Sequence, residues 1–314
     1  MDKPKVIVIC GPTASGKTSL SIELAKQING EIVSCDSMQI YKDMTIGTAK
    51  PTPEEMQGIK HYLIDCISPE QRYSVAEYKK EATNAIKEIL SKGKVPIVVG
   101  GTGLYLESLI YGIEYNEIEV DDAYRKELEE IERTQGLNKL YEMAEKIDRQ
   151  AMEKISQNDR KRICRVLEIY HSTGKTKTEL ETESRKNGPE FDYWLFGITM
   201  DREKLYERIN KRVDVMINDG LVQEVENLLK KYHNFPTAMQ GLGYKEVVEY
   251  LNGDISKEEM IEKIKMETRR YAKRQLTWFR KYKNIIWIDG LDNIQNNIQI
   301  ILEEYCGKNS KKKE

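Results

Sequence analysis

The feature that most constrains the fold is an apolar segment that runs directly into a glycine-rich loop near the N-terminus. Residues 6–10 (VIVIC) are continuously apolar and rich in β-branched residues, which is typical of a parallel strand covered on both faces. Residues 11–18 (GPTASGKT) match the phosphate-loop pattern GxxxxGK[ST] in full. The apolar spacing that follows predicts a helix ending at Asn29 and Gly30. Together these segments predict a loop that binds phosphate through backbone N–H groups and a helix N-terminus.

The rest of the chain alternates strand-like runs with helical patterns. This alternation predicts a P-loop NTPase-like α/β fold, in which a parallel sheet carries helices on both faces. The further strand-like runs are residues 31–35, 95–101, 193–200 and 284–290.

Long charged helical patterns with few strand signals interrupt this alternation and predict an inserted all-helical domain at residues 116–196. The catalytic core is then discontinuous, with residues 1–115 and 197–305. The basic tail, residues 306–314, lacks an apolar face, and we expect it to be disordered.

Composition excludes several classes of protein. No apolar run approaches 18 residues, so we expect a cytoplasmic chain without a membrane span. Five scattered cysteines without a CxxC pair, and only three histidines, provide no zinc spacing. The net charge is −2, but acids gather at residues 114–132 and bases at residues 263–283. This separation of acids from bases says more about binding partners than the net charge does. We expect a monomer.

The phosphate loop supplies the first candidate site. Lys17 is expected on the terminal phosphate, and the Thr18 hydroxyl on a magnesium ion. Taken alone, such a loop is typical of ATP-binding proteins. The residues expected to bind phosphates are Gly11, Pro12, Thr13, Ala14, Ser15, Gly16, Lys17 and Thr18.

A second candidate residue follows the strand-like run at residues 31–35. Typical phosphate-loop hydrolases end another strand in an acid that helps to hold magnesium, but the run at residues 95–101 ends in glycine and Thr102. Asp36 is the nearest acid at a strand end, and we place its strand beside the phosphate-loop strand. Its carboxylate could accept a proton or hold a magnesium-bound water. Asp-Ser is as often an N-cap or turn, and the residues leave both interpretations open.

Amide and aromatic side chains near these strand ends are candidates for contacting a base. Gln39 and Tyr41 suit reading a base edge and stacking on it. Thr102 offers a hydroxyl and Tyr105 an aromatic wall, while the neighbouring glycines let the backbone approach closely or only make a turn.

Two arginines lie four residues apart in the helical pattern predicted for residues 205–232. Arg208 and Arg212 share one face, so their guanidiniums could clamp a pyrophosphate from the side opposite Lys17. Pairing with surface acids such as Glu207 is the alternative.

Two basic segments are candidates for binding a nucleic-acid backbone. Residues 158–168 (NDRKRICRVLE) put Arg162 and Arg165 on one helix face, which is either a solvated face or one that grips phosphates. Residues 268–283 hold seven Lys or Arg and no acid, interleaved with aromatic residues that could pack the helix or stack on bases. The absence of acids from the second segment favours nucleic-acid binding.

Seven strings spread over residues 6–283 jointly resemble the bacterial tRNA dimethylallyltransferases: GPTASGKT, DSMQIY, DMTIGTAKPTPEE, GGTGLY, NDRKRICRVLE, AMQGLGYKE and AKRQLTWFRK. The resemblance implies transfer of a dimethylallyl group from dimethylallyl diphosphate to N6 of adenosine 37, in tRNAs that read codons beginning with U. The products are N6-(dimethylallyl)adenosine and diphosphate. It also implies that the adenosine is flipped out of its loop and that Mg²⁺ takes part.

The resemblance implies a role for each site residue. Asp36 accepts the proton from N6, while Lys17, Thr18 with magnesium and Arg212 neutralise the departing pyrophosphate. Arg160 and Lys161 carry more charge here than is usual at these two positions in the family. The residues implied to contact tRNA are Asp36, Ser37, Met38, Gln39, Thr102, Arg125, Lys161, Arg162, Ile163, Cys164, Arg165, Lys273, Arg274 and Arg280.

Three rival functions share some of these features. A nucleoside or nucleotide kinase has the same loop and fold class but leaves the acid-free segment at residues 268–283 unexplained. An adenylate isopentenyltransferase, which takes free AMP or ATP as acceptor, does not require the long helical insertion. A non-enzymatic RNA-binding protein does not require Lys17, Thr18 and Asp36 together.

Overall fold

The computed structural model describes residues 3–113, 121–185 and 188–307. The chain forms two compact units: the core unit, Met1–Ile110 with Glu190–Glu314, and the helical unit, Tyr111–Pro189. The insertion thus begins and ends earlier than the expected 116–196. It ends earlier because strand β5 (Asp192–Thr199) pairs with β1 (Lys5–Cys10) in the sheet of the core unit.

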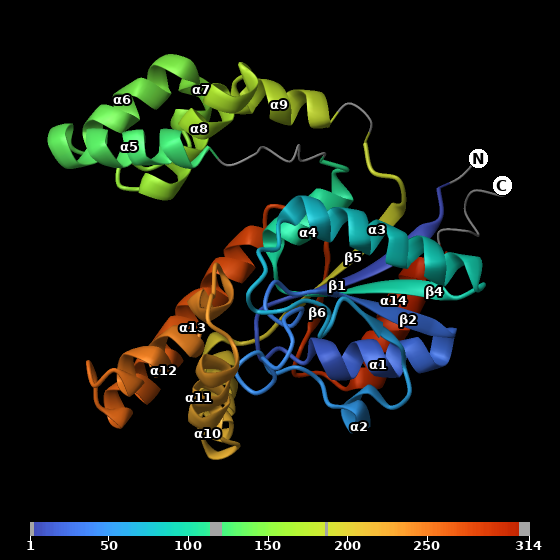
Figure 1. Ribbon diagram of the computed structural model, residues 1–314. Coiled ribbons are helices and arrows are strands. Elements are labelled where there is room, and N and C mark those ends of the chain that lie inside the picture. The colour runs from blue at the N-terminus through green and yellow to red at the C-terminus, as the bar shows by residue number, and fades with distance from the viewer. Residues whose placement is uncertain (1–2, 114–120, 186–187, 308–314) are drawn as a thin grey trace. The chain divides into compact units, whose positions relative to one another are not determined.

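The core unit is built on a six-stranded sheet with the order β3-β2-β4-β1-β5-β6, in which every pairing is parallel (Figure 1). The expected α/β fold is confirmed, and each strand-like run forms a strand. Two-residue β3 was not expected, since it is too short to give a periodic signal. The remaining strands are β2 (Gly30–Cys35), β3 (His61–Tyr62), β4 (Val95–Gly100) and β6 (Ile286–Asp289).

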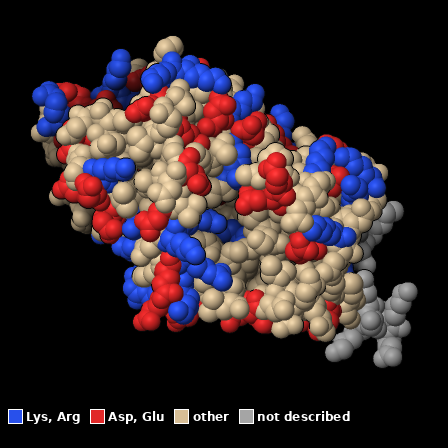
Figure 2. Space-filling model, turned by 90° about the horizontal axis from the view of Figure 1, so that it is seen from below, with Lys and Arg blue, Asp and Glu red and all other residues tan. Residues whose placement is uncertain are grey.

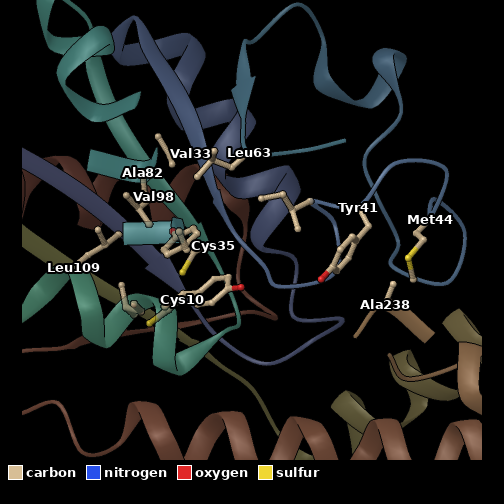
Figure 3. Packing of buried hydrophobic residues seen from close by; sticks show 14 of the residues in the cluster. Cys10, Val33, Cys35, Tyr41, Met44, Leu63, Ala82, Val98, Leu109 and Ala238 are labelled. Atoms are coloured by element: carbon tan, nitrogen blue, oxygen red, sulfur yellow. The ribbon is translucent and has the colours of Figure 1, made fainter. Parts of the chain in front are cut away.

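Helices cover both faces of the sheet because the strands are apolar on both sides. In β1, Val6, Val8 and Cys10 pack in one layer, which includes α3 (Val75–Ser91) and α4 (Gly103–Ile110), as Figure 3 shows in part. Ile7 and Ile9 pack in the other layer, with α1 (Lys17–Ile28) and α14 (Ile294–Gly307). Alternate side chains of one strand therefore hold two helical layers.

The remaining helices of the core unit follow β5. The helical pattern expected at residues 205–232 forms two helices, because Gly220 has φ 98° and starts a new helix in the left-handed region. Cys306 and Gly307 end α14 and so are helical, unlike the expected tail, and residues 308–314 lie outside the described residues. The helices are α2 (Pro53–Met56), α10 (Arg202–Asn218), α11 (Leu221–Lys231), η1 (Ala238–Gln240), α12 (Tyr244–Leu251) and α13 (Lys257–Phe279).

The helical unit contains five described helices around its own apolar core, which includes Leu128, Leu140 and Val166. Asp148 is 4% exposed and accepts hydrogen bonds from the amide and hydroxyl of Thr178, which joins the second half of the unit to the first. The helices are α5 (Asp122–Gln135), α6 (Leu137–Ile147), α7 (Arg149–Met152), α8 (Arg160–Thr173) and α9 (Lys177–Ser184). None of the described helices is long and apolar enough for a bilayer crossing.

Candidate active site

The phosphate loop joins β1 to α1 as the sequence predicts. Ala14 (φ 62°) and Gly16 (φ 93°) both adopt the left-handed region, and Gly16 is the N-cap of α1 without a side-chain cap. The first amides of α1 are therefore left for another acceptor. The Ser15 hydroxyl is buried and has no hydrogen-bond partner within the described residues. A loop with these properties is suited to an anion.

Lys17 is the cation at the centre of this loop. Its Nζ donates to the carbonyls of Gly11 (3.0 Å) and Pro12 (2.7 Å). Burial and the nearby charge of Arg212 lower the pKa of Lys17 to about 8, while Asp36 opposes this shift. The structure therefore brings Lys17, Arg212 and Asp36 within electrostatic reach of one another, although they are far apart in sequence.

Asp36 caps the turn that follows β2, which is one of the two interpretations that the sequence left open. Its Oδ1 accepts from the amides of Met38 (2.9 Å) and Gln39 (3.3 Å), as a turn-capping aspartate does. Its other oxygen, Oδ2, has no hydrogen-bond partner in the described part of the chain. The turn thus fixes the carboxylate and leaves one oxygen for a proton.

The strand that ends at Asp36 does not lie beside the phosphate-loop strand, and that expectation is wrong. β4 lies between β2 and β1, so the three strand ends line one edge of the sheet. A Cβ at Gly100 would lie 2.1 Å from the Cys35 carbonyl oxygen, which shows how closely the ends of β4 and β2 approach. The order of strands depends on long-range pairing, which the local pattern does not contain.

Thr102 links the segments that follow β4 and β2. Its amide donates to the Cys35 carbonyl (3.1 Å), and its Oγ1 accepts from the Ser37 amide (3.0 Å). Thr102 and Ser37 are both among the residues implied to contact tRNA. Both are half-buried and lie next to Asp36.

The expected aromatic contacts with a base are wrong at two positions. Tyr41 is 2% exposed, and its hydroxyl bonds the Thr237 hydroxyl at 2.6 Å. Tyr105 is 6% exposed and stacks on Tyr78 with ring centroids 4.1 Å apart. Both rings belong to the core, since their apolar area favours burial once the hydroxyl of Tyr41 is paired.

Met38 and Gln39 are half-buried at the same edge. The Gln39 amide donates to the carbonyls of Thr48 and Ala49, both at 3.2 Å, so its Nε2 is engaged and its Oε1 is left as an acceptor. Met38 packs close to Gly241, where an added Cβ would lie 2.5 Å from the Met38 methyl carbon.

The two arginines of α10 have different partners. The Arg208 guanidinium donates to the Gly290 carbonyl at 3.2 Å. Much of the Arg212 side chain is exposed, yet burial around its guanidinium lowers its pKa. Glu207 pairs with Lys204 instead of either arginine. Of the two arginines, Arg212 is the one whose charge lowers the pKa of Lys17.

Helix α13 packs one face against the glycines that follow β4. A Cβ at Gly101 would lie 2.1 Å from the Gln275 amide nitrogen, and one at Gly103 would lie 2.6 Å from the Trp278 ring. Phe279 is fully buried, so the aromatic residues here pack the helix instead of stacking on bases. The GGTG and KRQLTW segments are therefore in direct contact in the folded chain.

The other face of α13 and its C-cap carry exposed bases. Lys273, Arg274 and Arg280 are exposed, and no acidic side chain of the described residues pairs with them. On the face drawn in Figure 2, bases and acids are interspersed. The exposed cations without an acidic partner are therefore a local feature of α13 and its C-cap, which the net charge of the chain does not reveal.

The candidate tRNA-binding residues of the helical unit are mostly ion-paired. Arg125 and Arg165 both pair with Glu168, at 2.7 Å and 3.3 Å, and Arg162 pairs with Asp159 at 3.1 Å. Lys161 is exposed, and no acidic side chain in the described ranges pairs with it.

Two of the expected tRNA contacts in α8 point inward. Ile163 is fully buried in the core of the helical unit, so its side chain cannot contact tRNA, and that expectation is wrong. Cys164 is half-buried, and burial raises the pKa of its thiol.

Sequence reasoning missed two residues that organise the site. Gln275 accepts from the Thr13 amide (2.9 Å) and donates to the Gly101 carbonyl (2.9 Å). Glu224 accepts from the three amides of residues 45–47 and from the Tyr244 hydroxyl. Gln275 is an uncharged polar residue within a basic run, and this is only a weak indication of a structural role. Nothing in the neighbouring sequence distinguishes Glu224 from an ordinary surface acid.

These contacts define a site with opposite charges on its two sides. Lys17, Arg212 and the amides of the phosphate loop supply positive charge, and the carboxylate of Asp36 supplies negative charge. Within the described part of the chain no cluster of three or more His, Cys, Asp or Glu side chains could hold a metal by itself. The arrangement suits a reaction in which a phosphate group leaves while a proton is removed nearby.

Comparisons with known proteins point the same way. A family model described as IPP transferase matches residues 39–282. A tRNA dimethylallyltransferase of Acetivibrio thermocellus is 56% identical over 285 residues, which cover 90% of this chain and 91% of the relative. Another, from a Thermoanaerobacter species, is 50% identical and covers 97% of this chain and 98% of the relative.

Solved structures agree with the sequence relatives. A tRNA isopentenylpyrophosphate transferase from Bacillus halodurans has TM-score 0.74 and 41% identity, and covers 99% of this chain and 98% of that one. A eukaryotic dimethylallyltransferase acting on tRNA has TM-score 0.78 and 33% identity, and covers 98% of this chain and 77% of that one. The chain therefore belongs to the IPP transferase family.

Proposed function

We propose that the chain transfers a dimethylallyl group from dimethylallyl diphosphate to N6 of adenosine 37 in tRNAs that read codons beginning with U. The relatives named above are tRNA dimethylallyltransferases. The observation that carries the proposal is the placement of Asp36 within electrostatic reach of Lys17 and its phosphate loop. A base and a phosphate-binding loop are the two parts that such a transfer needs.

The Asp36 carboxylate is the general base of the proposed reaction. N6 forms a bond to the allylic carbon of the donor, the bond from that carbon to the diphosphate oxygen breaks, and N6 loses a proton to Oδ2. Oδ1 remains bound to the amides of Met38 and Gln39, which keep the carboxylate in place. Ser37 and Thr102 border the acceptor base.

The leaving diphosphate is stabilised by positive charge on its own side of the site. Lys17 and Arg212 supply two cations, and the loop supplies amides. Mg²⁺ commonly binds through one or two protein oxygens together with substrate phosphates. The Thr18 hydroxyl would be the protein ligand. The buried Ser15 hydroxyl, which has no hydrogen-bond partner in the described ranges, belongs to the same loop. When bound, the ion would neutralise charge on the diphosphate.

The acceptor is a macromolecule in this proposal because the basic residues extend beyond the chemical site. Lys273, Arg274 and Arg280 are exposed cations of the core unit, and Lys161, Arg162, Arg165 and Arg125 belong to the helical unit. Their task is to neutralise tRNA phosphates. A cytoplasmic location and a monomeric state are parts of the proposal.

The test is a transfer assay with labelled dimethylallyl diphosphate, magnesium and one of two acceptors: an unmodified anticodon stem-loop or AMP. We expect label in the stem-loop. A stem-loop with guanosine in place of adenosine 37 is the matched control and should stay unlabelled. Label in AMP alone would favour an adenylate isopentenyltransferase, and label in neither acceptor would refute the transfer.

A further inference from the structure

Gln275 connects three segments that the reaction must hold in register. Its side chain is 5% exposed and lies on α13. The carbonyl oxygen of the side chain accepts from the Thr13 amide at 2.9 Å, and its amide nitrogen donates to the Gly101 carbonyl at 2.9 Å. One side chain thus bridges the phosphate loop and the loop after β4.

An amide side chain satisfies both contacts, because it carries an acceptor and a donor on one planar group. The Thr13 N–H requires an acceptor and the Gly101 carbonyl requires a donor, so the orientation of the Gln275 amide is determined. A glutamate would place a second acceptor against the carbonyl. An apolar residue would leave a buried donor and a buried acceptor unpaired.

The space around Gln275 is equally specific. A Cβ at Gly101 would lie 2.1 Å from the Gln275 amide nitrogen, so any other residue there would displace that amide. Trp278 covers Gly103 one helical turn later, and Tyr271 lies beside Thr102 one turn earlier. One face of α13 is therefore packed along residues 101–103.

The segments that Gln275 joins carry the two reacting groups of the proposed function. Thr13 belongs to the loop that holds the diphosphate, and Gly101 precedes Thr102, which binds the segment of Ser37 and Asp36. We propose that Gln275 is a positioning residue that holds the diphosphate loop at the distance from Asp36 and the acceptor base that transfer requires. This inference rests on the proposed function.

Two consequences distinguish this role from simple packing. The Thr13 amide is engaged by Gln275, so the diphosphate is bound by the other amides of the loop and by Lys17. Both polar atoms of the Gln275 amide are engaged by the protein, and the side chain lies on the buried face of α13, away from the exposed bases. Its loss should therefore lower the rate of transfer far more than the affinity for either substrate.

The experiment uses the length-matched substitution Gln275→Met in the full chain. With both substrates saturating, we expect kcat to fall about 100-fold, which is the cost typical of a displacement of about 1 Å in a reacting pair. We expect KM for dimethylallyl diphosphate and Kd for the anticodon stem-loop to change less than about threefold, because the groups that bind them remain.

Asn297→Leu is the matched control. Asn297 is 4% exposed, and its amide donates to the Asp289 carbonyl at 2.7 Å, so the variant loses a buried amide of similar exposure outside the three joined segments. Both variants should lower Tm, but only Gln275→Met should lower kcat. A Tm loss in Gln275→Met with kcat within threefold of the unaltered chain would make Gln275 a packing residue and overturn the inference.

A second variant approaches the same contact from the other side. Gly101→Ala leaves Gln275 in place but pushes its amide away. We expect a fall in kcat similar to that of Gln275→Met, and a double variant little worse than either one, because both break the same bridge. Losses that multiply in the double variant would contradict a shared bridge. No transfer by the unaltered chain would instead refute the proposed function, and this inference with it.

Discussion

The core unit and the helical unit hold their candidate functional residues in opposite ways. In the core unit, Asp36, Thr102 and Gln275 are fixed by hydrogen bonds to backbone amides and carbonyls. In the helical unit, Arg125 and Arg165 share Glu168 in exposed or half-buried ion pairs. The first kind of contact defines one geometry, whereas the second kind is readily exchanged.

This difference matches the two tasks proposed for the chain. Prenyl transfer needs reacting groups aligned before the substrates arrive, which hydrogen bonds to the backbone provide. Binding to tRNA phosphates needs cations that can leave a surface acid for a phosphate at little cost, since an exposed ion pair contributes only about 0–1 kcal/mol. Substitutions in the core unit should therefore change rates, and those among exposed bases should change affinity and its salt dependence.

The largest effect is expected for Asp36→Asn. The new side chain keeps the oxygen that caps the turn at Met38 and Gln39 but can no longer take the proton from N6. We expect kcat to fall at least about 100-fold, within the range for losing a general base, with tRNA affinity retained. Single-turnover transfer and filter binding measure the two quantities. Undiminished turnover would remove Asp36 from the base role.

Lys17→Met should give the next largest effect, seen in diphosphate binding. Burial and Arg212 lower the pKa of Lys17 to about 8, so the residue is charged below that pH and neutral above it. Because the anion favours charged Lys17, diphosphate affinity should fall as pH rises past about 8, by up to about tenfold per unit. Calorimetry from pH 6.5 to 9.5 tests this expectation.

The Lys17→Met variant supplies the control for that pH series. It should bind diphosphate about 10–100-fold more weakly at neutral pH, as expected for losing a charged hydrogen bond, and should lack the weakening above pH 8. The same weakening in both proteins would assign it to another group.

Arg280→Ala should have a smaller effect, confined to tRNA. The residue is exposed, and no acid in the described part of the chain pairs with it, so it is available for a phosphate. We expect weaker binding and a slope of log Kd against log salt that is smaller by about one. Lys26→Ala, which removes a base paired with Glu23 on α1, should leave the slope unchanged. An unchanged slope in Arg280→Ala would show that the Arg280 side chain is solvated and contacts no tRNA phosphate.

The smallest expected effect is a gain. Glu168→Gln releases Arg125 and Arg165 from their shared acid, which competes with tRNA phosphates. Binding of the anticodon stem-loop should strengthen by up to about fivefold, the equivalent of one surface ion pair. Weaker binding would show instead that Glu168 holds the two arginines in the geometry that tRNA requires. The helical unit would then also use contacts that fix one geometry, as the core unit does.

The parts of the fold and site that the sequence predicted correctly are those that depend on residues close together in the chain. Residues 6–18 predict β1 and its loop because a strand, a tight turn and a helix start all depend on neighbouring residues. Tyr41 and Tyr105 were misplaced because an aromatic ring near a site and one in the core look alike in sequence. The misplaced border at residue 196 has the same origin, since a strand joins a sheet by pairing with distant strands.

The sequence by itself determined the chemical parts: a phosphate loop with Lys17, an aspartate at a strand end, and a basic helix. Each is encoded by residue type and short spacing. Only the tertiary structure decided how they meet, because the contacts that join them span long separations. Gln275 reaches Thr13 across 262 positions, and β4 lies between the strands that end at Asp36 and at the loop. Such contacts form only when the sheet and α13 bury their apolar faces together, so a local pattern does not contain them.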